Sequence, residues 1–483
     1  MSLSKILSYL SRLAFVPVVV YCAALGRHAL EGHFSTDDPM NMGYAWNHGF
    51  GYLLWHSITF WSTAYRPMGE LLYLSIYSFF GMNPLPYRIA IVGVMVVNAY
   101  LSYRLAELLT GSRTVAFLTG VFAGAHAYMV VLYYQNSFVY DVLVYFFSIL
   151  TLICYVSARK QGVPSLFQSA GIICLFIAAL NSKEIGIALA GFILAYEVLF
   201  HGAPTWAGAM TWMKREGRLP MIIVLLGLIY AAGKLTGPET LAKMGGYEIH
   251  LSVAKYLEST LRHWNDLFYM FKTQSRTILV AIDVMLLTLL LFFKKSPAVR
   301  WCCFYILTAL LPITFIPQRG GAQLYLGLFG WALLLAIAFV KLFETLSPAL
   351  VWSRFKIPPV ATSVVLVMVL TYFYVSLTVD TWRQSTAHNL EDQAETWSVL
   401  SQLRDLPFRP KPGSRVLFLD EPFKEFRMAF IAQLVWNDHS VYIDLATTHP
   451  EALAPANIAE FDSLLTVESG QVKLVRSSLE PVH

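Results

Sequence analysis

Charged residues are scarce in this sequence of 483 amino acids. Asp, Glu, Lys and Arg make up 13% of the chain, against roughly 25% in ordinary soluble proteins, and 57% of the residues are hydrophobic. This composition excludes a disordered protein, a coiled coil and a nucleic-acid binder. The five cysteines show neither metal-ligand spacing nor a disulfide framework, which excludes a disulfide-stapled secreted module. The sequence therefore indicates a polytopic membrane protein.

The few charges are unevenly distributed along the chain. Residues 380–483 carry 9 basic and 15 acidic side chains, or 23% of the segment, whereas residues 1–379 carry 26 basic and 15 acidic side chains, or 11%. The second value is typical of a membrane domain and the first of a soluble one. We therefore predict a membrane body over 1–379 and a soluble domain over 380–483.

Apolar stretches of near-spanning length recur through the membrane body. About 18–20 apolar residues suffice for a helix to cross a roughly 30 Å hydrocarbon layer. Such stretches occupy 7–25, 88–108, 115–133, 138–157, 166–181, 185–201, 219–235, 277–293, 301–316, 323–340 and 358–379. A further stretch, 68–80, is shorter, and its length alone does not distinguish a short span from a helix lying at the interface.

The basic loops decide between these alternatives. If 68–80 does not cross, Lys5, Arg12 and all the later basic loop clusters fall on one side, as the positive-inside rule requires of the cytoplasmic side. We therefore predict eleven spans, with the N-terminus inside and the C-terminal tail outside. The first span lacks an A-x-A cleavage site, which predicts a retained signal anchor.

This topology exposes three external segments. The first, 26–87, contains the interfacial stretch. The second, 236–276, contains apolar and charged residues at helical spacing from about Leu251, which predicts an amphipathic helix on the membrane. The third is the tail, where apolar runs at Val416–Leu419 and Val441–Leu445 flank a helical stretch near 424–436. That alternation predicts a small α/β domain.

One motif in the tail resembles nucleotide chemistry. The run Val416–Pro422 looks like the Walker B strand of a transporter ATPase, but the chain contains no G-x-x-x-x-G-K-[ST] loop to bind the phosphates. Lys234 follows Gly233, yet Leu235 stands where Ser or Thr is required. The sequence therefore argues against an ATPase.

Five clusters of polar residues lie at the external ends of the predicted spans. Ionisable groups at such places are costly to desolvate and are candidates for function. The clusters hold Asp37 and Asp38, Arg66, Asn136 and Asp141, Lys183 and Glu184, and Gln318 and Arg319 with Tyr325 one turn beyond. Together they suit a reaction in which a carboxylate deprotonates an acceptor while cations hold a lipid phosphate.

Each cluster also has a purely structural interpretation. Asp37 is placed to be the N-cap of a helix. Lys183 and Glu184 are compatible with an ordinary interfacial ion pair. Arg66 and Arg319 are compatible with snorkelling anchors, and Asp141 with a polar gap between helices.

Histidines near the first acidic pair raise the question of a metal site. His33 lies four residues before Asp37, which makes a His/Asp metal site conceivable; His28 lies five residues before His33, but no third ligand at a fixed spacing completes such a site. His126, inside an apolar run, is typical of an internal histidine with a satisfied ring. We predict no cofactor, with a divalent metal as the alternative.

Several of these residues occur in an order that resembles a known superfamily. The matching elements are Asp37-Asp38, Arg66-Pro67-Met68 … Tyr87-Arg88, Tyr103-Arg104 … Arg113, Ser182-Lys183-Glu184, and Leu311-Pro312 … Arg319 … Tyr325. Over roughly 30–345 the chain resembles the polytopic glycosyltransferases of the C-type (GT-C) fold, which use polyprenyl-phosphate sugars. It is most similar to bacterial relatives of the protein O-mannosyltransferases and of the lipid A aminoarabinose transferase.

The resemblance implies roles for individual residues. Asp37 would be the general base on the acceptor hydroxyl, and Asp38 would orient it or bind the acceptor. Arg66 and Arg319 would bind the donor phosphate. Asp141 would be a second acidic residue of the substrate cavity, together with Asn136, Lys183, Glu184, Gln318 and Tyr325. The family more often has Asp-Glu at the first pair, which leaves open whether Asp37 or Asp38 is the base.

We therefore predict an all-α, GT-C-like membrane body of about eleven transmembrane helices with a small external α/β domain. The expected activity is transfer of a sugar, with inversion, from a polyprenyl phosphate to a hydroxyl of a protein, lipid or glycan acceptor. The expected place is the periplasmic face of an inner membrane. One alternative is a transporter or flippase of a lipid-linked precursor, which would more often show repeats and charge at the membrane midplane. A non-catalytic assembly protein is the other.

Overall fold

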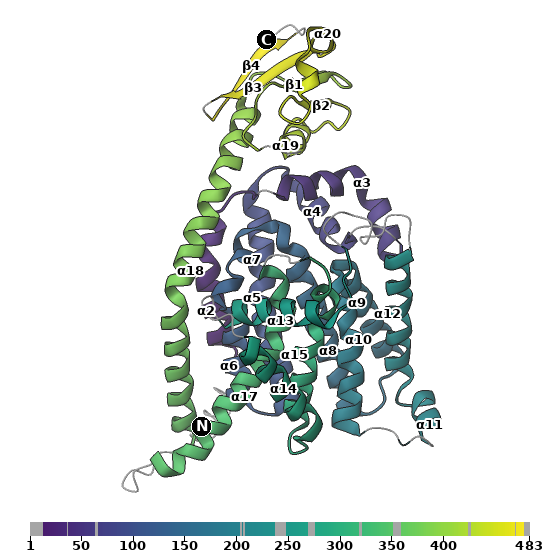
Figure 1. Ribbon diagram of the computed structural model, residues 1–483, viewed down its shortest axis with the longest axis vertical. Coiled ribbons are helices and arrows are strands. Elements are labelled where there is room, and N and C mark those ends of the chain that lie inside the picture. Colours follow the sequence, from purple (N-terminus) through teal and green to yellow (C-terminus); the bar gives the residue numbers. More distant parts are fainter. Residues whose placement is uncertain are drawn as a thin grey trace, which may run out of the picture.

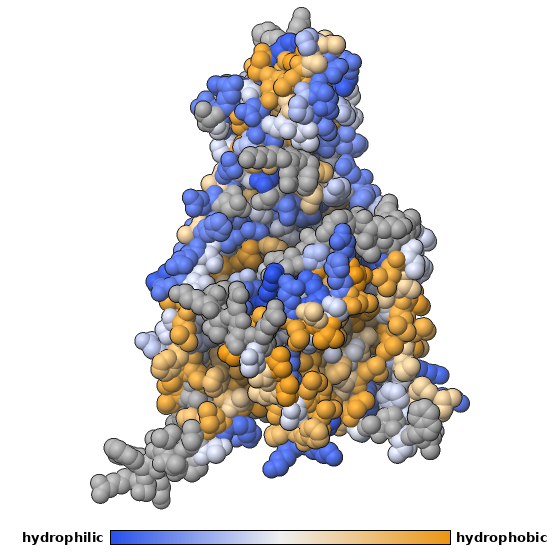
Figure 2. All heavy atoms as spheres, viewed as in Figure 1, coloured by the Kyte–Doolittle hydropathy of each residue, from blue (hydrophilic) through white to orange (hydrophobic). Residues whose placement is uncertain are grey.

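The computed structural model describes residues 13–477, with the exception of 36, 63–65, 203–204, 206–207, 237–247, 269–275, 318–320, 351–358, 424–426 and 469. Helices dominate it, and a small sheet stands beyond one end of the helical bundle (Figure 1). Apolar side chains cover a broad band of the visible face of the bundle, whereas polar side chains cover much of the visible face of the sheet domain (Figure 2).

Six helical segments among the described residues are long and apolar enough to cross a membrane. They are Pro84–Thr110, Asn136–Gln161, Glu184–His201, Arg218–Thr236, Pro297–Thr314 and Gly321–Thr345. A bent pair, Arg113–Gly124 and Ala127–Tyr134, with 47° between its halves, would make a seventh span. Leu166–Ser182 and Val280–Phe292 are shorter apolar helices. The chain is therefore a multi-pass membrane protein.

Each of the eleven predicted stretches coincides with helical structure in the described residues. The corresponding elements are α2 (Val16–Gly26), α5 (Pro84–Thr110), α6 (Arg113–Gly124) with η2 (Ala127–Met129) and α7 (Val131–Tyr134), α8 (Val139–Gln161), α9 (Leu166–Ser182), η4 (Glu184–Ile187) with α10 (Ala188–Tyr196) and η5 (Glu197–His201), α12 (Arg218–Thr236), α14 (Arg276–Phe292), α15 (Pro297–Ala309) with α16 (Leu311–Thr314), α17 (Tyr325–Leu350) and α18 (Pro359–Asp405). Because only six or seven meet the spanning criterion, eleven crossings stay a prediction.

Two helices from the first predicted external segment cover one end of the bundle. η1 (Arg27–Glu31) leads towards α3 (Asp38–Ile58), which lies across that end above α4 (Pro67–Phe80) (Figure 1). A helix over 68–80 is thus confirmed, and its 14 residues are too few to span a bilayer. Gly49 has a φ of 74° and bends α3. A side chain at Gly69 would lie 2.3 Å from the Tyr140 ring, so α4 packs closely against α8.

The predicted amphipathic helix is present as α13 (Val253–Leu267), which begins where the Ser252 hydroxyl accepts a hydrogen bond from Lys255 N. Its buried face includes Trp264, which meets the Trp331 ring edge-to-face at 4.9 Å. Shorter elements complete the body: η3 (Asn136–Phe138), α11 (Ala209–Lys214) and η7 (Gly321–Leu324).

The C-terminal part contains the predicted small α/β fold. The sheet has the order β2-β1-β3-β4, with β1 (Arg415–Phe418) parallel to both β2 (Tyr442–Leu445) and β3 (Ser463–Glu468). β3 and β4 (Gln471–Ser477) form an antiparallel pair. α19 (Arg427–Trp436) connects β1 to β2, while η8 (Pro450–Leu453) and α20 (Pro455–Ile458) precede β3.

One long helix joins the body to the sheet domain. α18 contains 47 residues and passes without interruption through the predicted boundary at 379/380 (Figure 1). The domain also rests on the end of the body. The Tyr77 hydroxyl donates to Leu434 O at 3.0 Å, and a side chain at Gly43 would lie 2.4 Å from the Phe430 ring. α3, α4 and the sheet domain therefore share one end of the molecule.

Candidate active site

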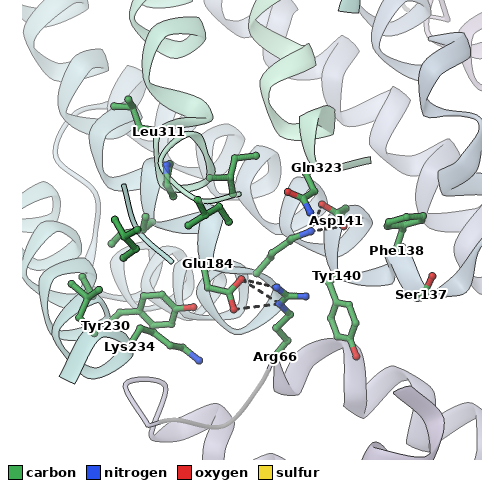
Figure 3. Close-up of a pocket in the computed structure, with 18 of the residues that line it drawn as sticks. Arg66, Ser137, Phe138, Tyr140, Asp141, Glu184, Tyr230, Lys234, Leu311 and Gln323 are labelled. Atoms are coloured by element: carbon green, nitrogen blue, oxygen red, sulfur yellow. Dashed lines mark hydrogen bonds and ion pairs between the residues drawn. The ribbon is translucent and has the colours of Figure 1, made fainter. Parts of the chain in front are cut away.

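A cavity of about 540 Å³ lies at this end of the bundle (Figure 3). Six charged side chains line it, three acidic and three basic: Asp37, Asp141, Glu184, Arg66, Lys183 and Lys234. Aromatic and polar side chains add Tyr140, Tyr230, Asn41 and Gln323. Part of its wall is apolar, formed by Ile187, Leu235, Ile249, Leu311, Pro312, Ile313 and Ile316. Charged groups and an apolar wall thus meet in one space.

Arg66 enters the cavity from the start of α4. It has a left-handed backbone with a φ of 50°, which is uncommon for a residue other than glycine, and Pro67 follows as the first helical residue. Its guanidinium forms an ion pair with Glu184 through two donors. The Nη2 atom of Arg66 lies 3.0 Å from Oε2 of Glu184, and the Nε atom lies 3.2 Å from the same oxygen. The guanidinium also lies 5.3 Å from the centre of the Tyr140 ring. Strained backbone of this kind is common at functional sites.

A second ion pair, between Lys183 and Asp141, also lines the cavity. Lys183 Nζ lies 2.6 Å and 2.7 Å from the two carboxylate oxygens of Asp141. Lys183 is the extended residue that ends α9, and the short helix η4 begins at Glu184. Because the chain turns there, neighbouring residues direct Lys183 towards Asp141 and Glu184 towards Arg66 (Figure 3). Both members of the Lys183–Asp141 pair are buried, so each stabilises the other's charge.

The two carboxylates of the acidic pair have different surroundings. Asp37 is exposed and lines the cavity. Asp38 is fully buried, and its carboxylate accepts hydrogen bonds from Ser35 N at 2.7 Å and from the Tyr73 hydroxyl at 3.2 Å. Burial raises the pKa of Asp38 to about 6, although the nearby charge of Arg88 opposes the rise. Asp37 is therefore the member of the pair that faces the cavity.

The chain matches no protein-family model and no curated protein sequence. Among solved structures it is similar to ArnT of Cupriavidus metallidurans, solved bound to undecaprenyl phosphate, with 12% identity and a TM-score of 0.50 over 94% of this chain and 92% of that one. It is also similar to the oligosaccharyltransferase of Archaeoglobus fulgidus in the apo form, with 11% identity and a TM-score of 0.50 over 89% of this chain and 65% of that one. The chain has the GT-C fold.

Within this GT-C fold, five of the ten predicted site residues line the cavity: Asp37, Arg66, Asp141, Lys183 and Glu184. Asp38 lies behind them. Asn136 is buried against a much smaller cavity near Tyr73 and Tyr87. Tyr325 is buried in the bundle, where its ring stacks on Tyr145 at 4.1 Å. Gln318 and Arg319 lie outside the described residues.

The cavity also contains residues that the sequence analysis did not select. Lys234, near the end of α12, lies 5.5 Å from the Tyr230 ring centre, and both line the cavity (Figure 3). Lys234 was considered above only as a nucleotide-loop lysine. The available signal was a lone cation at the external end of a predicted span. Gln323 and Tyr140 carried no comparable signal, because uncharged polar residues are common at span ends.

No group of three or more His, Cys, Asp or Glu side chains within the described part of the chain is placed to hold a metal ion. The ring of His33 instead stacks on Trp397, with 4.4 Å between ring centres. His28 Nδ1 lies 3.6 Å from Glu31 Oε1. His126 is buried, and its Nε2 lies 2.9 Å from Leu267 O. Activity without a cofactor stays a prediction.

Proposed function

We propose that this protein is a membrane glycosyltransferase that moves a sugar from a polyprenyl phosphate to an acceptor hydroxyl. The observation that carries the proposal is the composition of this cavity: an exposed carboxylate, three cations and an apolar wall. A polyprenyl-phosphate sugar has matching parts, namely an anionic phosphate, a polar sugar and an apolar chain. The GT-C fold, shared with ArnT in its complex with undecaprenyl phosphate, supports the same class of donor.

In this mechanism Asp37 is the general base. Its position at the start of α3, exposed to the cavity, would let it accept the proton of a bound acceptor hydroxyl. The deprotonating oxygen attacks the anomeric carbon, a bond to the acceptor forms, and the bond to the phosphate oxygen breaks. Attack opposite the leaving lipid phosphate inverts the anomeric configuration.

The cations stabilise the leaving phosphate. Arg66 presents a planar guanidinium that matches phosphate oxygens, and Lys183 and Lys234 add point charges in the same cavity. Negative charge grows on the phosphate as the bond to the sugar breaks, so these contacts strengthen in the transition state. Arg319 is a further proposed phosphate ligand. Asp141 and Glu184 would keep Lys183 and Arg66 in place until the donor arrives.

The acceptor and the location follow from the same chemistry. A polyprenyl-phosphate donor carries its own leaving group, so no nucleotide is needed at the cavity, and an external face is suitable. We propose the periplasmic face of an inner membrane, with a protein, lipid or glycan hydroxyl as acceptor. Asp38, buried beneath Asp37, would orient the acidic loop rather than touch substrate.

The experiment uses purified full-length protein, labelled polyprenyl-phosphate sugars and membrane extract, with identification of the labelled product. Wild-type protein should transfer label, and Asp37→Asn should lower the rate by about 100-fold or more, as expected for loss of a general base. Asp38→Asn serves as the comparison, because it removes the neighbouring carboxylate that does not line the cavity. Full activity in both variants would refute Asp37 as the base, and no labelled product with wild type would refute glycosyl transfer.

A further inference from the structure

Helix α18 carries two glutamines that make matched pairs of hydrogen bonds to other segments. Gln393 Oε1 accepts from His33 N at 2.8 Å, and its Nε2 donates to Tyr134 O at 2.6 Å. Gln402 Oε1 accepts from Val472 N at 3.0 Å, and its Nε2 donates to Gly470 O at 2.7 Å. Each side chain thus satisfies one backbone donor and one backbone acceptor that belong to another part of the fold.

Gln393 joins α18 to the loop that leads into Asp37. This glutamine is completely buried, and hydrogen bonds buried in this way are costly to leave unmade. A side chain at Gly32 would lie 2.8 Å from Gln393 Oε1, so the loop backbone approaches the glutamine closely. One turn along α18, Trp397 stacks on the His33 ring with an interplanar angle of 4°. The loop is therefore held at His33, four residues before Asp37.

A second route leads from Gln393 to the acidic pair. Tyr134 O, which accepts from Gln393, also accepts from the guanidinium of Arg88. The charge of the fully buried Arg88 acts on Asp38, whose carboxylate in turn accepts from Ser35 N. Gln393 therefore contacts the segment directly at His33, and it shares the acceptor Tyr134 O with Arg88, whose charge acts on Asp38.

Gln402 makes the corresponding link at the other end. Its partners Gly470 and Val472 belong to the turn between β3 and β4 and to the start of β4. The two glutamines are nine residues apart on one helix, about 13 Å along its axis. They bind the same helix to the acidic loop on one side and to the sheet domain on the other.

We infer that Gln393 is a positioning residue for Asp37: α18 holds the acidic loop at His33 so that the Asp37 carboxylate stays directed into the cavity. The inference rests on the proposed function, because it assigns Asp37 the role of base. It assigns no substrate contact to Gln393, which does not line the cavity. Gln402 holds the sheet domain in the same way without touching the acidic loop.

The first test measures the loop itself. Gln393→Met keeps the volume and removes both hydrogen bonds, and Gln402→Met does the same at the matched position. Hydrogen–deuterium exchange of the full chain in detergent should show faster exchange around His33 in Gln393→Met. In Gln402→Met the faster exchange should appear around Val472 instead. Unchanged exchange around His33 in Gln393→Met would refute the link between α18 and the acidic loop.

The second test measures transfer. Loss of positioning should lower kcat for Gln393→Met by about 10- to 100-fold, with the donor KM changed less than about twofold. Gln402→Met should keep kcat within about twofold. Gln393→Glu keeps an acceptor for His33 N and loses the donor to Tyr134 O, so its kcat should lie between wild type and Gln393→Met. This variant also provides the comparison if the methionine variant does not fold.

The outcomes separate the inference from the proposed function. A loosened loop with kcat equal to that of Gln402→Met would show that Gln393 is structural only and would overturn the positioning role. A raised donor KM with unchanged kcat would overturn it as well. If wild-type protein transfers no sugar, the proposed function fails, and the exchange experiment still decides whether Gln393 holds the loop.

Discussion

At the scale of single residues, the charges in the cavity balance. Three carboxylates and three cations line it, and four of these groups form the pairs Arg66–Glu184 and Asp141–Lys183. The sequence analysis placed all four on one side of the membrane and offered Lys183–Glu184 as a structural ion pair. In the structure each instead pairs with a residue distant in the chain, Glu184 with Arg66, 118 positions away, and Lys183 with Asp141, 42 positions away. In the proposed mechanism an incoming lipid phosphate would compete with Glu184 for Arg66, so we expect this ion pair to influence donor affinity.

The variant Arg66→Ala tests that competition. Removing the guanidinium should raise the donor KM by about tenfold or more, the scale of one lost charge-assisted hydrogen bond. Glu184→Gln is the matched change, since it leaves Arg66 in place and removes its competitor; its donor KM should be equal to or below the wild-type value. The measurement is initial rate against donor concentration. An unchanged donor KM in Arg66→Ala would show that Arg66 does not bind the donor phosphate and is only a structural anchor.

A pH prediction follows from Asp38. Its pKa is raised to about 6 in the folded chain, against about 3.9 in an unfolded one. The folded state therefore binds the proton more tightly, and the stability contributed by Asp38 is present below about pH 4 and lost as the pH rises to about 6. The full loss is on the order of 3 kcal/mol.

Asp38→Asn does not titrate, so it isolates this effect. Thermal unfolding in detergent, measured for both proteins between pH 4 and pH 7, should show Tm of wild type falling relative to Tm of the variant as the pH rises. A shift in the opposite direction would mean that Arg88 and the two hydrogen bonds outweigh burial and lower the pKa of Asp38.

At the scale of elements, apolar length predicts the helices of the body, and long-range packing decides what lines the cavity. All eleven apolar stretches overlap helices in the part of the chain that the structure describes, because hydropathy and length are local properties. Asn136 and Tyr325 were predicted to line the cavity and do not. The short helix η3 directs Ser137 and Phe138 into the cavity, while Asn136 is buried behind them. The sequence defines the ends of a helix only approximately, so it cannot tell which of several adjacent residues at a span end lines the cavity.

The contact between α4 and α8 offers a prediction at this scale. Because a side chain at Gly69 would lie 2.3 Å from the Tyr140 ring, Gly69→Ala should push Tyr140 away from its place beside Arg66. We expect lower transfer and a lower Tm, with a cost of about 1–3 kcal/mol for overpacking. Gly93→Ala is the control: it changes the same residue type within α5, where a side chain would meet nothing within 4 Å. Equal Tm values for the two variants would contradict the close packing of α4 on α8.

At the scale of the whole molecule, composition predicts two parts but not the helix that joins them. The charge content changes near residue 380, and α18 continues through that point to Asp405. At 1.5 Å per residue its 47 residues extend about 70 Å, more than twice the roughly 30 Å of a hydrocarbon layer. The apolar first part and the polar remainder thus form one rigid element. A change in composition shows where the surroundings of the chain change from lipid to water, but a helix can continue through that point.

Because α18 is one continuous helix, a single measurement can determine how the protein is oriented in the membrane. α3 and the sheet domain lie at the same end of the bundle (Figure 1), and residues at the start of α3 line the cavity. The buried Arg159–Glu197 ion pair lies 18 residues further along α8 from Asp141, which corresponds to about 27 Å along the helix. A reporter after His483 therefore reports the side of the cavity as well as the side of the C-terminus.

Alkaline phosphatase fused there should be active, and a fluorescent protein fused there should be dark if exported unfolded. The same reporters fused after Lys295, in a loop whose basic residues predict a cytoplasmic position, should give the opposite signals. A cytoplasmic signal from the His483 fusion would place the cavity inside the cell, where nucleotide sugars are available and the case for a lipid-phosphate donor loses one of its supports.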